Sequence, residues 1–159
     1  MKLLAFDTSN QALSLAILED EHLLAQTTLN VKKNHSITLM PAIDFLMNSL
    51  DMKPTDLDRI VVAQGPGSYT GLRIAVATAK TLAHTLRIEL VGVSSLLALV
   101  PEQVEGLVIP VMDARRNNVY AGFYQSGQAV RSEAHLPLAE VLEIAGAADQ
   151  PVTFVGETA

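Results

Sequence analysis

Short apolar runs separated by polar turns open the chain. Residues 2–6 (KLLAF), 12–18 (ALSLAIL) and 22–29 (HLLAQTTL) are each apolar enough to form a strand, and the polar segments 7–11 and 19–21 join them. Turn-forming residues in short connections between such runs are typical of β-hairpins. The pattern therefore predicts a three-stranded antiparallel meander at the N-terminus.

Two longer segments, residues 35–50 and 70–86, have the apolar spacing of helices. Both carry more apolar residues than one face of a sheet can cover, and the first is apolar around most of its circumference. The helices either cover each other or together present an apolar surface to another protein, and we favour the second interpretation. The candidate residues for that surface are His35, Leu39, Ile43, Leu46, Met47, Leu72, Arg73, Val76 and Lys80.

The rest of the chain predicts a second lobe that begins as the first one does. An apolar strand, an aspartate, a polar turn and another strand occur in residues 107–124, so that Asp113 corresponds to Asp7. We therefore expect lobes at residues 1–100 and 101–159, in an α/β fold whose second lobe is incomplete in this chain. The remaining predicted elements are strands 59–64, 89–93 and 151–157 and helices 94–100 and 136–147.

A glycine-rich segment, GPGSYTG at residues 65–71, joins strand 59–64 to helix 70–86. It is not a phosphate-binding P-loop, because no lysine follows the glycines at the required spacing. One interpretation is structural: Pro66-Gly67 makes the turn, Ser68 or Thr70 caps the helix, and Gly71 permits close packing. The other places Gly65, Gly67 and Ser68 beside a nucleotide or a partner.

The sequence Asp7-Thr8-Ser9 follows the first strand directly. A carboxylate with neighbouring hydroxyl groups at the end of a strand can hold Mg²⁺ and phosphate, which makes these three residues candidates for a position close to a nucleotide. The alternative, which we favour from the residues alone, is an Asx turn in which the aspartate caps its own backbone.

Composition narrows the classes of function. The chain of 159 residues has no cysteine, and its four histidines are not at metal-binding spacing, so we expect no catalytic or metal-binding residues. The net charge is −6, and the densest basic spots are the pairs Lys32-Lys33 and Arg115-Arg116. If the protein works on a nucleic acid, another molecule supplies most of the phosphate contacts. Because the apolar runs are short, we expect a soluble, cytoplasmic protein with no membrane association.

Four motifs resemble those of the TsaB (YeaZ) family. They are LLAFDTS at residues 3–9, HSITLMP at 35–41, GPGSYTGLRIA at 65–75 and MDARRNNVYAGFY at 112–124. The resemblance covers essentially the whole chain. It implies the actin-like, sugar-kinase and Hsp70-like ATPase fold, which is built from ribonuclease H-like lobes.

The resemblance also implies a function: a non-catalytic subunit that binds and activates its paralogue TsaD, with residues 35–50 and 70–86 at the interface. TsaD transfers threonylcarbamoyl from its adenylate to adenine 37 of tRNA, forming N6-threonylcarbamoyladenosine. The implied partners are TsaD, the small ATPase TsaE, and a second copy of the chain when TsaD is absent, with tRNA contacted only through the complex. No cofactor is expected to bind tightly, and ATP or ADP is expected only at the interface shared with TsaD. The alternatives are an ATP-binding kinase or ATPase of the same fold and an M22 glycoprotease-like peptidase.

Overall fold

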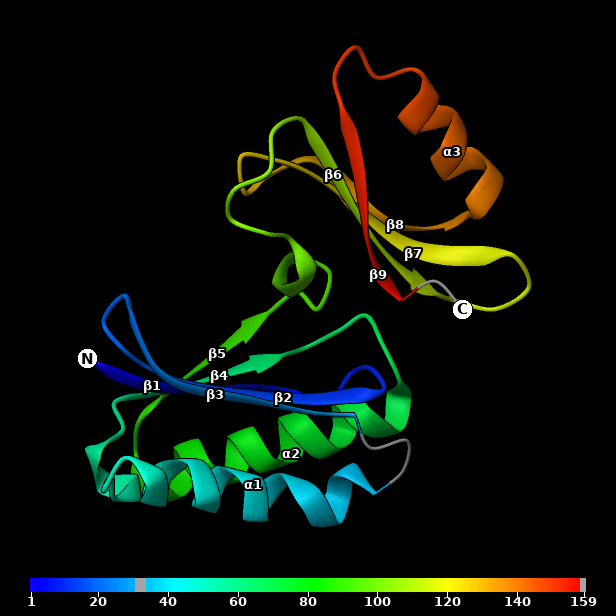
Figure 1. The fold of residues 1–159 in the computed structure, drawn as a ribbon. Coiled ribbons are helices and arrows are strands. Elements are labelled where there is room, and N and C mark those ends of the chain that lie inside the picture. The colour runs from blue at the N-terminus through cyan, green and yellow to red at the C-terminus, as the bar shows by residue number, and fades with distance from the viewer. Residues whose placement is uncertain (31–33, 158–159) are drawn as a thin grey trace. The chain divides into compact units, whose positions relative to one another are not determined.

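The computed structural model describes residues 1–30 and 34–157, and the Lys32-Lys33 pair lies outside these residues. Two compact units make up the chain, residues 1–95 and residues 96 onward (Figure 1). Each unit contains one sheet with one or two helices packed against it, and each has its own apolar core. None of the described helices is long and apolar enough to cross a bilayer.

The first unit has a mixed five-stranded sheet in the order β3-β2-β1-β4-β5. The antiparallel meander predicted at the N-terminus is confirmed, because β1 pairs with β2 and β2 with β3 in antiparallel register. The last two strands join in parallel, with β4 beside β1 and β5 beside β4. The strands are β1 (Lys2–Asp7), β2 (Ala12–Glu19), β3 (His22–Asn30), β4 (Arg59–Ala63) and β5 (Glu89–Val93).

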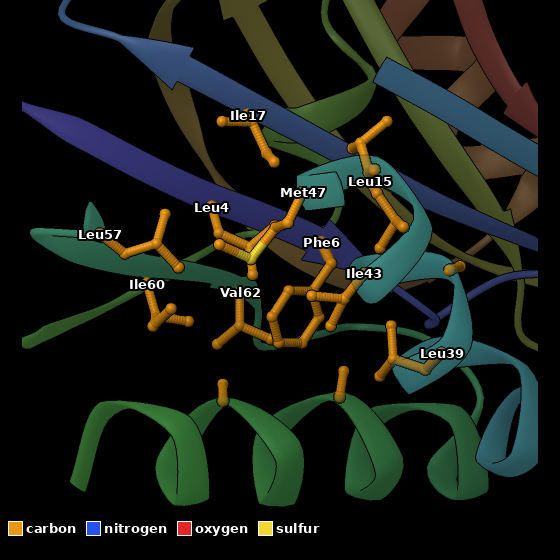
Figure 2. Packing of buried hydrophobic residues seen from close by; sticks show 14 of the residues in the cluster. Leu4, Phe6, Leu15, Ile17, Leu39, Ile43, Met47, Leu57, Ile60 and Val62 are labelled. Atoms are coloured by element: carbon orange, nitrogen blue, oxygen red, sulfur yellow. The ribbon is translucent and has the colours of Figure 1, made fainter. Parts of the chain in front are cut away.

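Two helices, α1 (His35–Ser49) and α2 (Tyr69–Leu86), cover the same face of this sheet (Figure 1). Between helices and strands lies the main core, where Phe6 and Val62 of the strands lie close to Ile43 of α1 (Figure 2). The face of α2 toward the sheet carries the buried small residues Ala75, Ala79 and Ala83. Small side chains let the helix approach the strands closely.

The prediction of a helix at residues 94–100 is wrong, because only a single 3₁₀ turn, η2 (Leu97–Leu99), forms there. Ser94 and Ser95 are the residues that could have capped such a helix. The Ser95 hydroxyl instead accepts a hydrogen bond from the Gly65 backbone N–H at 3.2 Å, and its own N–H donates to the Gly65 carbonyl at 2.8 Å. This segment is therefore used to hold the start of the glycine loop. A second short turn, η1 (Pro54–Asp56), precedes β4.

The four strands of the second unit follow the same order as the first four strands of the first unit. The second sheet runs β8-β7-β6-β9, with antiparallel pairs up to β6 and a parallel pair between β6 and β9. In both units a helix connects the third strand to the parallel fourth strand. The elements are β6 (Leu107–Asp113), β7 (Asn118–Gln125), β8 (Gln128–Pro137), α3 (Leu138–Gly146) and β9 (Val152–Glu157).

The correspondence between Asp7 and Asp113 extends to their hydrogen bonds. Each aspartate ends the first strand of its unit, and each carboxylate accepts from the backbone N–H two residues later, Ser9 at 2.7 Å and Arg115 at 2.9 Å. Both are therefore Asx turns. The sequence repeat that relates residues 107–124 to the start of the chain thus corresponds to two structurally equivalent hairpins.

Candidate functional site

The glycine loop lies against the turn between β1 and β2. The first of two contacts is made by Gly71, where the loop enters α2. Thr8 is fully buried, and its hydroxyl donates a 2.6 Å hydrogen bond to the carbonyl oxygen of Gly71. A Cβ atom on Gly71 would stand 1.9 Å from the Thr8 carbonyl oxygen, which is well inside van der Waals contact. Glycine at position 71 is therefore required by the approach of the first turn of α2 to β1.

A second contact, one residue further along the turn, fixes the loop itself. The backbone N–H of Ser68 donates to the carbonyl of Ser9 at 2.7 Å. A Cβ atom on Gly67 would lie 2.6 Å from the Ser9 Cβ. The Ser68 hydroxyl accepts from the Gly71 N–H at 3.3 Å and caps α2, as the structural interpretation of the loop required.

Of the residues predicted to lie close to a nucleotide, Asp7, Thr8 and Ser68 therefore use their polar side-chain atoms within the chain. The buried Ser9 hydroxyl has no hydrogen-bond partner among the described residues. No three histidine, cysteine, aspartate or glutamate side chains within the described ranges are grouped so that they could hold a metal ion.

His35 lies at the start of α1, where it was predicted to contact a partner. It is half-buried, and its Nε2 atom lies 3.1 Å from the carbonyl oxygen of Asn10 in the β1–β2 turn. The His35 ring thereby ties the start of α1 to the same turn that holds the glycine loop.

The four α1 side chains predicted for the partner surface are buried in the core instead, namely Leu39, Ile43, Leu46 and Met47. The prediction that they belong to a surface is wrong, because their stripe is the one that faces the sheet. The opposite stripe of α1 is exposed and mixes large apolar residues with polar ones, including Asp44 and Asn48. It carries Ile37 (69% exposed), Met40 and Phe45 (69% exposed), which the prediction left out.

The four α2 residues predicted for the partner surface do lie together. Leu72, Arg73, Val76 and Lys80 line one shallow depression, with Tyr69 and Ala77 beside them. Tyr69 is 74% exposed, and the Arg73 guanidinium lies over its ring, 5.5 Å from the centroid. Helical spacing therefore placed these four residues on one side of α2, and their contact with a partner stays a prediction. Tyr69 was missed because helix 70–86 was predicted to begin one residue too late.

We define the helical face as Ile37, Met40 and Phe45 of α1 together with Tyr69, Leu72, Arg73, Val76 and Lys80 of α2. Leu72 and Val76 are half-buried, and the other six residues are exposed. Its α2 part is positively charged, because α2 contains no aspartate or glutamate while Arg73 and Lys80 both reach the surface. A partner that covers this part has to offer apolar side chains and carboxylates.

Comparisons with known proteins agree on threonylcarbamoyladenosine biosynthesis. The family model described as TsaD, tRNA N6-adenosine threonylcarbamoyltransferase, matches residues 22–158. The tRNA threonylcarbamoyladenosine biosynthesis protein TsaB of Bacillus subtilis is 47% identical, and the match covers 98% of this chain and 71% of that protein.

Solved structures give the same result. YeaZ from Pseudomonas aeruginosa matches with a TM-score of 0.79 and 34% identity, covering 86% of this chain and 67% of that chain. The activator of the 2-hydroxyisocaproyl-CoA dehydratase from Clostridium difficile matches with a TM-score of 0.53 and 14% identity, over 90% of this chain and 53% of that one. At that identity the second match shows the fold alone, and the fold is the predicted actin-like ATPase fold.

Proposed function

The chain belongs to the TsaB (YeaZ) family of tRNA threonylcarbamoyladenosine biosynthesis proteins, and we propose that it binds and activates the transferase TsaD as a non-catalytic subunit. The product of the complex is N6-threonylcarbamoyladenosine at position 37 of tRNA. The small ATPase TsaE joins the complex, and tRNA and any ATP or ADP are bound within it. Without TsaD, two copies of the chain pair with each other.

One observation carries this proposal: the helical face exposes large apolar side chains on both helices. Ile37, Phe45 and Tyr69 each leave more than two thirds of their surface in solvent. Large apolar side chains exposed on two neighbouring helices are typical of interaction sites, since exposing them to water is unfavourable. Both helices lie on one face of the sheet, so a single partner can cover them together.

The charge on this face favours TsaD over a second copy of the chain. Pairing α2 with α2 across a two-fold axis would bring Arg73 and Lys80 toward their own equivalents, with no aspartate or glutamate in either copy of α2 to offset them. A different subunit can present carboxylates around an apolar centre. The proposal is therefore that the homodimer is the weaker of the two complexes.

The hydrogen bonds within the glycine loop and the turn before it favour a structural role for these residues over a catalytic one. The Thr8 hydroxyl and the Asp7 carboxylate hold the turn and α2 in place, and that places the helical face. We assign the reacting groups to TsaD and the positioning of the complex to this chain.

Size-exclusion chromatography with light scattering tests the proposal directly. The chain is run alone and then mixed with its cognate TsaD at equal concentration. The expected result is a dimer alone that converts to a heteromeric complex on mixing. A chain whose mass is unchanged by TsaD would overturn the proposed function.

A further inference from the structure

The turn between β6 and β7 has an unusual backbone. Arg115, Arg116 and Asn117 have φ angles of +65°, +53° and +60°. This left-handed region is unfavourable for residues other than glycine, asparagine and aspartate, because Cβ approaches the following carbonyl oxygen. Across residues 1–30 and 34–157, no other stretch places even two consecutive non-glycine residues there. Two arginines thus occupy positions where glycine would be easier to accommodate.

Hydrogen bonds hold the turn in this conformation. The Arg115 N–H donates to the Asp113 carboxylate at 2.9 Å, and its carbonyl accepts from the Asn118 N–H at 3.0 Å. The Asn118 side-chain amide donates to the Arg116 carbonyl at 3.2 Å. The surrounding structure therefore over-determines an unfavourable backbone, which is the situation typical of functional sites.

The two arginine side chains have no structural use in the turn. Both are exposed, and within the part of the chain that the structure describes neither guanidinium forms an ion pair or a hydrogen bond. The chain as a whole carries a net charge of −6, so two adjacent arginines without an ion pair are unusual in it. Guanidinium groups bind phosphate through paired N–H donors.

We propose that the Arg115-Arg116 turn binds the phosphate backbone of tRNA when this chain is assembled with TsaD. The inference rests on the proposed function for the choice of RNA. The exposed side chains of the turn, those of Arg115, Arg116 and Asn117, are all hydrogen-bond donors and none is apolar. A protein partner would need a desolvated apolar centre to bind there, whereas an RNA backbone needs only charge and donors.

The test is the salt dependence of tRNA binding by the assembled complex. An unmodified tRNA transcript is titrated between about 50 and 200 mM KCl with wild type and with Arg115→Gln/Arg116→Gln. The affinity falls as salt rises, and each phosphate contact adds about 0.7–0.9 to the steepness of log affinity against log salt concentration. Loss of two contacts should therefore make the plot less steep by about 1.5. An unchanged slope overturns the proposal.

Three controls make the result specific. Lys53→Gln/Arg87→Gln removes two exposed charges elsewhere, one of them from a left-handed arginine, and should leave the slope unchanged. Arg115→Lys/Arg116→Lys keeps the charge and should keep most of the slope. ATP is tested as a separate probe. If the glutamine variant loses ATP binding and keeps the tRNA slope, the turn serves a nucleotide and the proposal fails.

The two proposals fail in different ways. Light scattering first establishes whether each variant assembles with TsaD. An intact complex with an unchanged slope overturns only the role of the turn. If wild type forms no complex, the proposed function fails, and the same slopes measured on the chain alone decide whether the turn binds RNA.

Discussion

The Thr8 hydroxyl donates to the Gly71 carbonyl at 2.6 Å, and the two backbones are so close that a Cβ on Gly71 would lie 1.9 Å from the Thr8 oxygen. This contact joins the end of β1 to the first turn of α2. Because α2 carries five of the eight residues of the helical face, the position of that face depends on glycine at residue 71. The glycine motif in the sequence is explained by packing at this contact.

Gly71→Ala should destabilise the chain by about 3 kcal/mol or more, because the added methyl group meets backbone that cannot move away without shifting α2. The matched control is Gly146→Ala at the end of α3, where a Cβ meets nothing within 4 Å. That variant should lose no stability. Chemical denaturation of both variants measures the difference. Equal stabilities would contradict the proposed packing role of Gly71.

Leu39 and Met40 are neighbours in α1 with opposite roles. Leu39 is buried in the core, so Leu39→Ala should cost about 2–5 kcal/mol of unfolding free energy. Met40 is exposed, and Met40→Ala should change stability by less than about 1 kcal/mol while weakening TsaD binding. Denaturation and calorimetric titration with TsaD separate the two effects. If Met40→Ala were the more destabilising variant, the assigned faces of α1 would be reversed.

The strands and helices of the first unit were largely predictable because their apolar periodicity is strong. The strand β8 was missed for the opposite reason. It lies at the edge of its sheet and its residues are mostly exposed, so no alternation of apolar and polar positions marks it. The predicted helix 136–147 accordingly began two residues early, on the last residues of that strand. Edge strands need few apolar residues, since neither face has to be fully buried.

The candidate surface was predictable on α2 and only partly on α1. In α2, small residues mark the side toward the sheet and large residues mark the outer side. In α1, both sides carry large apolar residues, and periodicity alone does not tell which stripe faces the strands. Leu39 and Ile43 were therefore placed on the surface while Ile37 and Phe45 were left out. The exposed apolar stripe became visible only once the sheet was in place.

Phe45→Glu should weaken binding to TsaD by at least about tenfold, because a charge would be placed in an apolar contact that excludes water. Stability should be almost unchanged, since the side chain is 69% exposed in the chain alone. Leu142→Glu on α3, another exposed apolar residue on a helix, is the matched control and should bind as wild type does. Equal losses of affinity in both variants would show that the effect is not specific to the helical face.

The most direct test of the central claim is the initial rate at which TsaD modifies tRNA, measured with threonylcarbamoyl-adenylate supplied and this chain titrated in. The account predicts a low rate for TsaD alone, a rate that rises to saturation with wild type, and a curve for Phe45→Glu displaced to at least about tenfold higher concentration. The chain without TsaD should give no product. A rate that is independent of the chain, or a Phe45→Glu curve that coincides with wild type, would contradict the claim that this chain activates TsaD through its helical face.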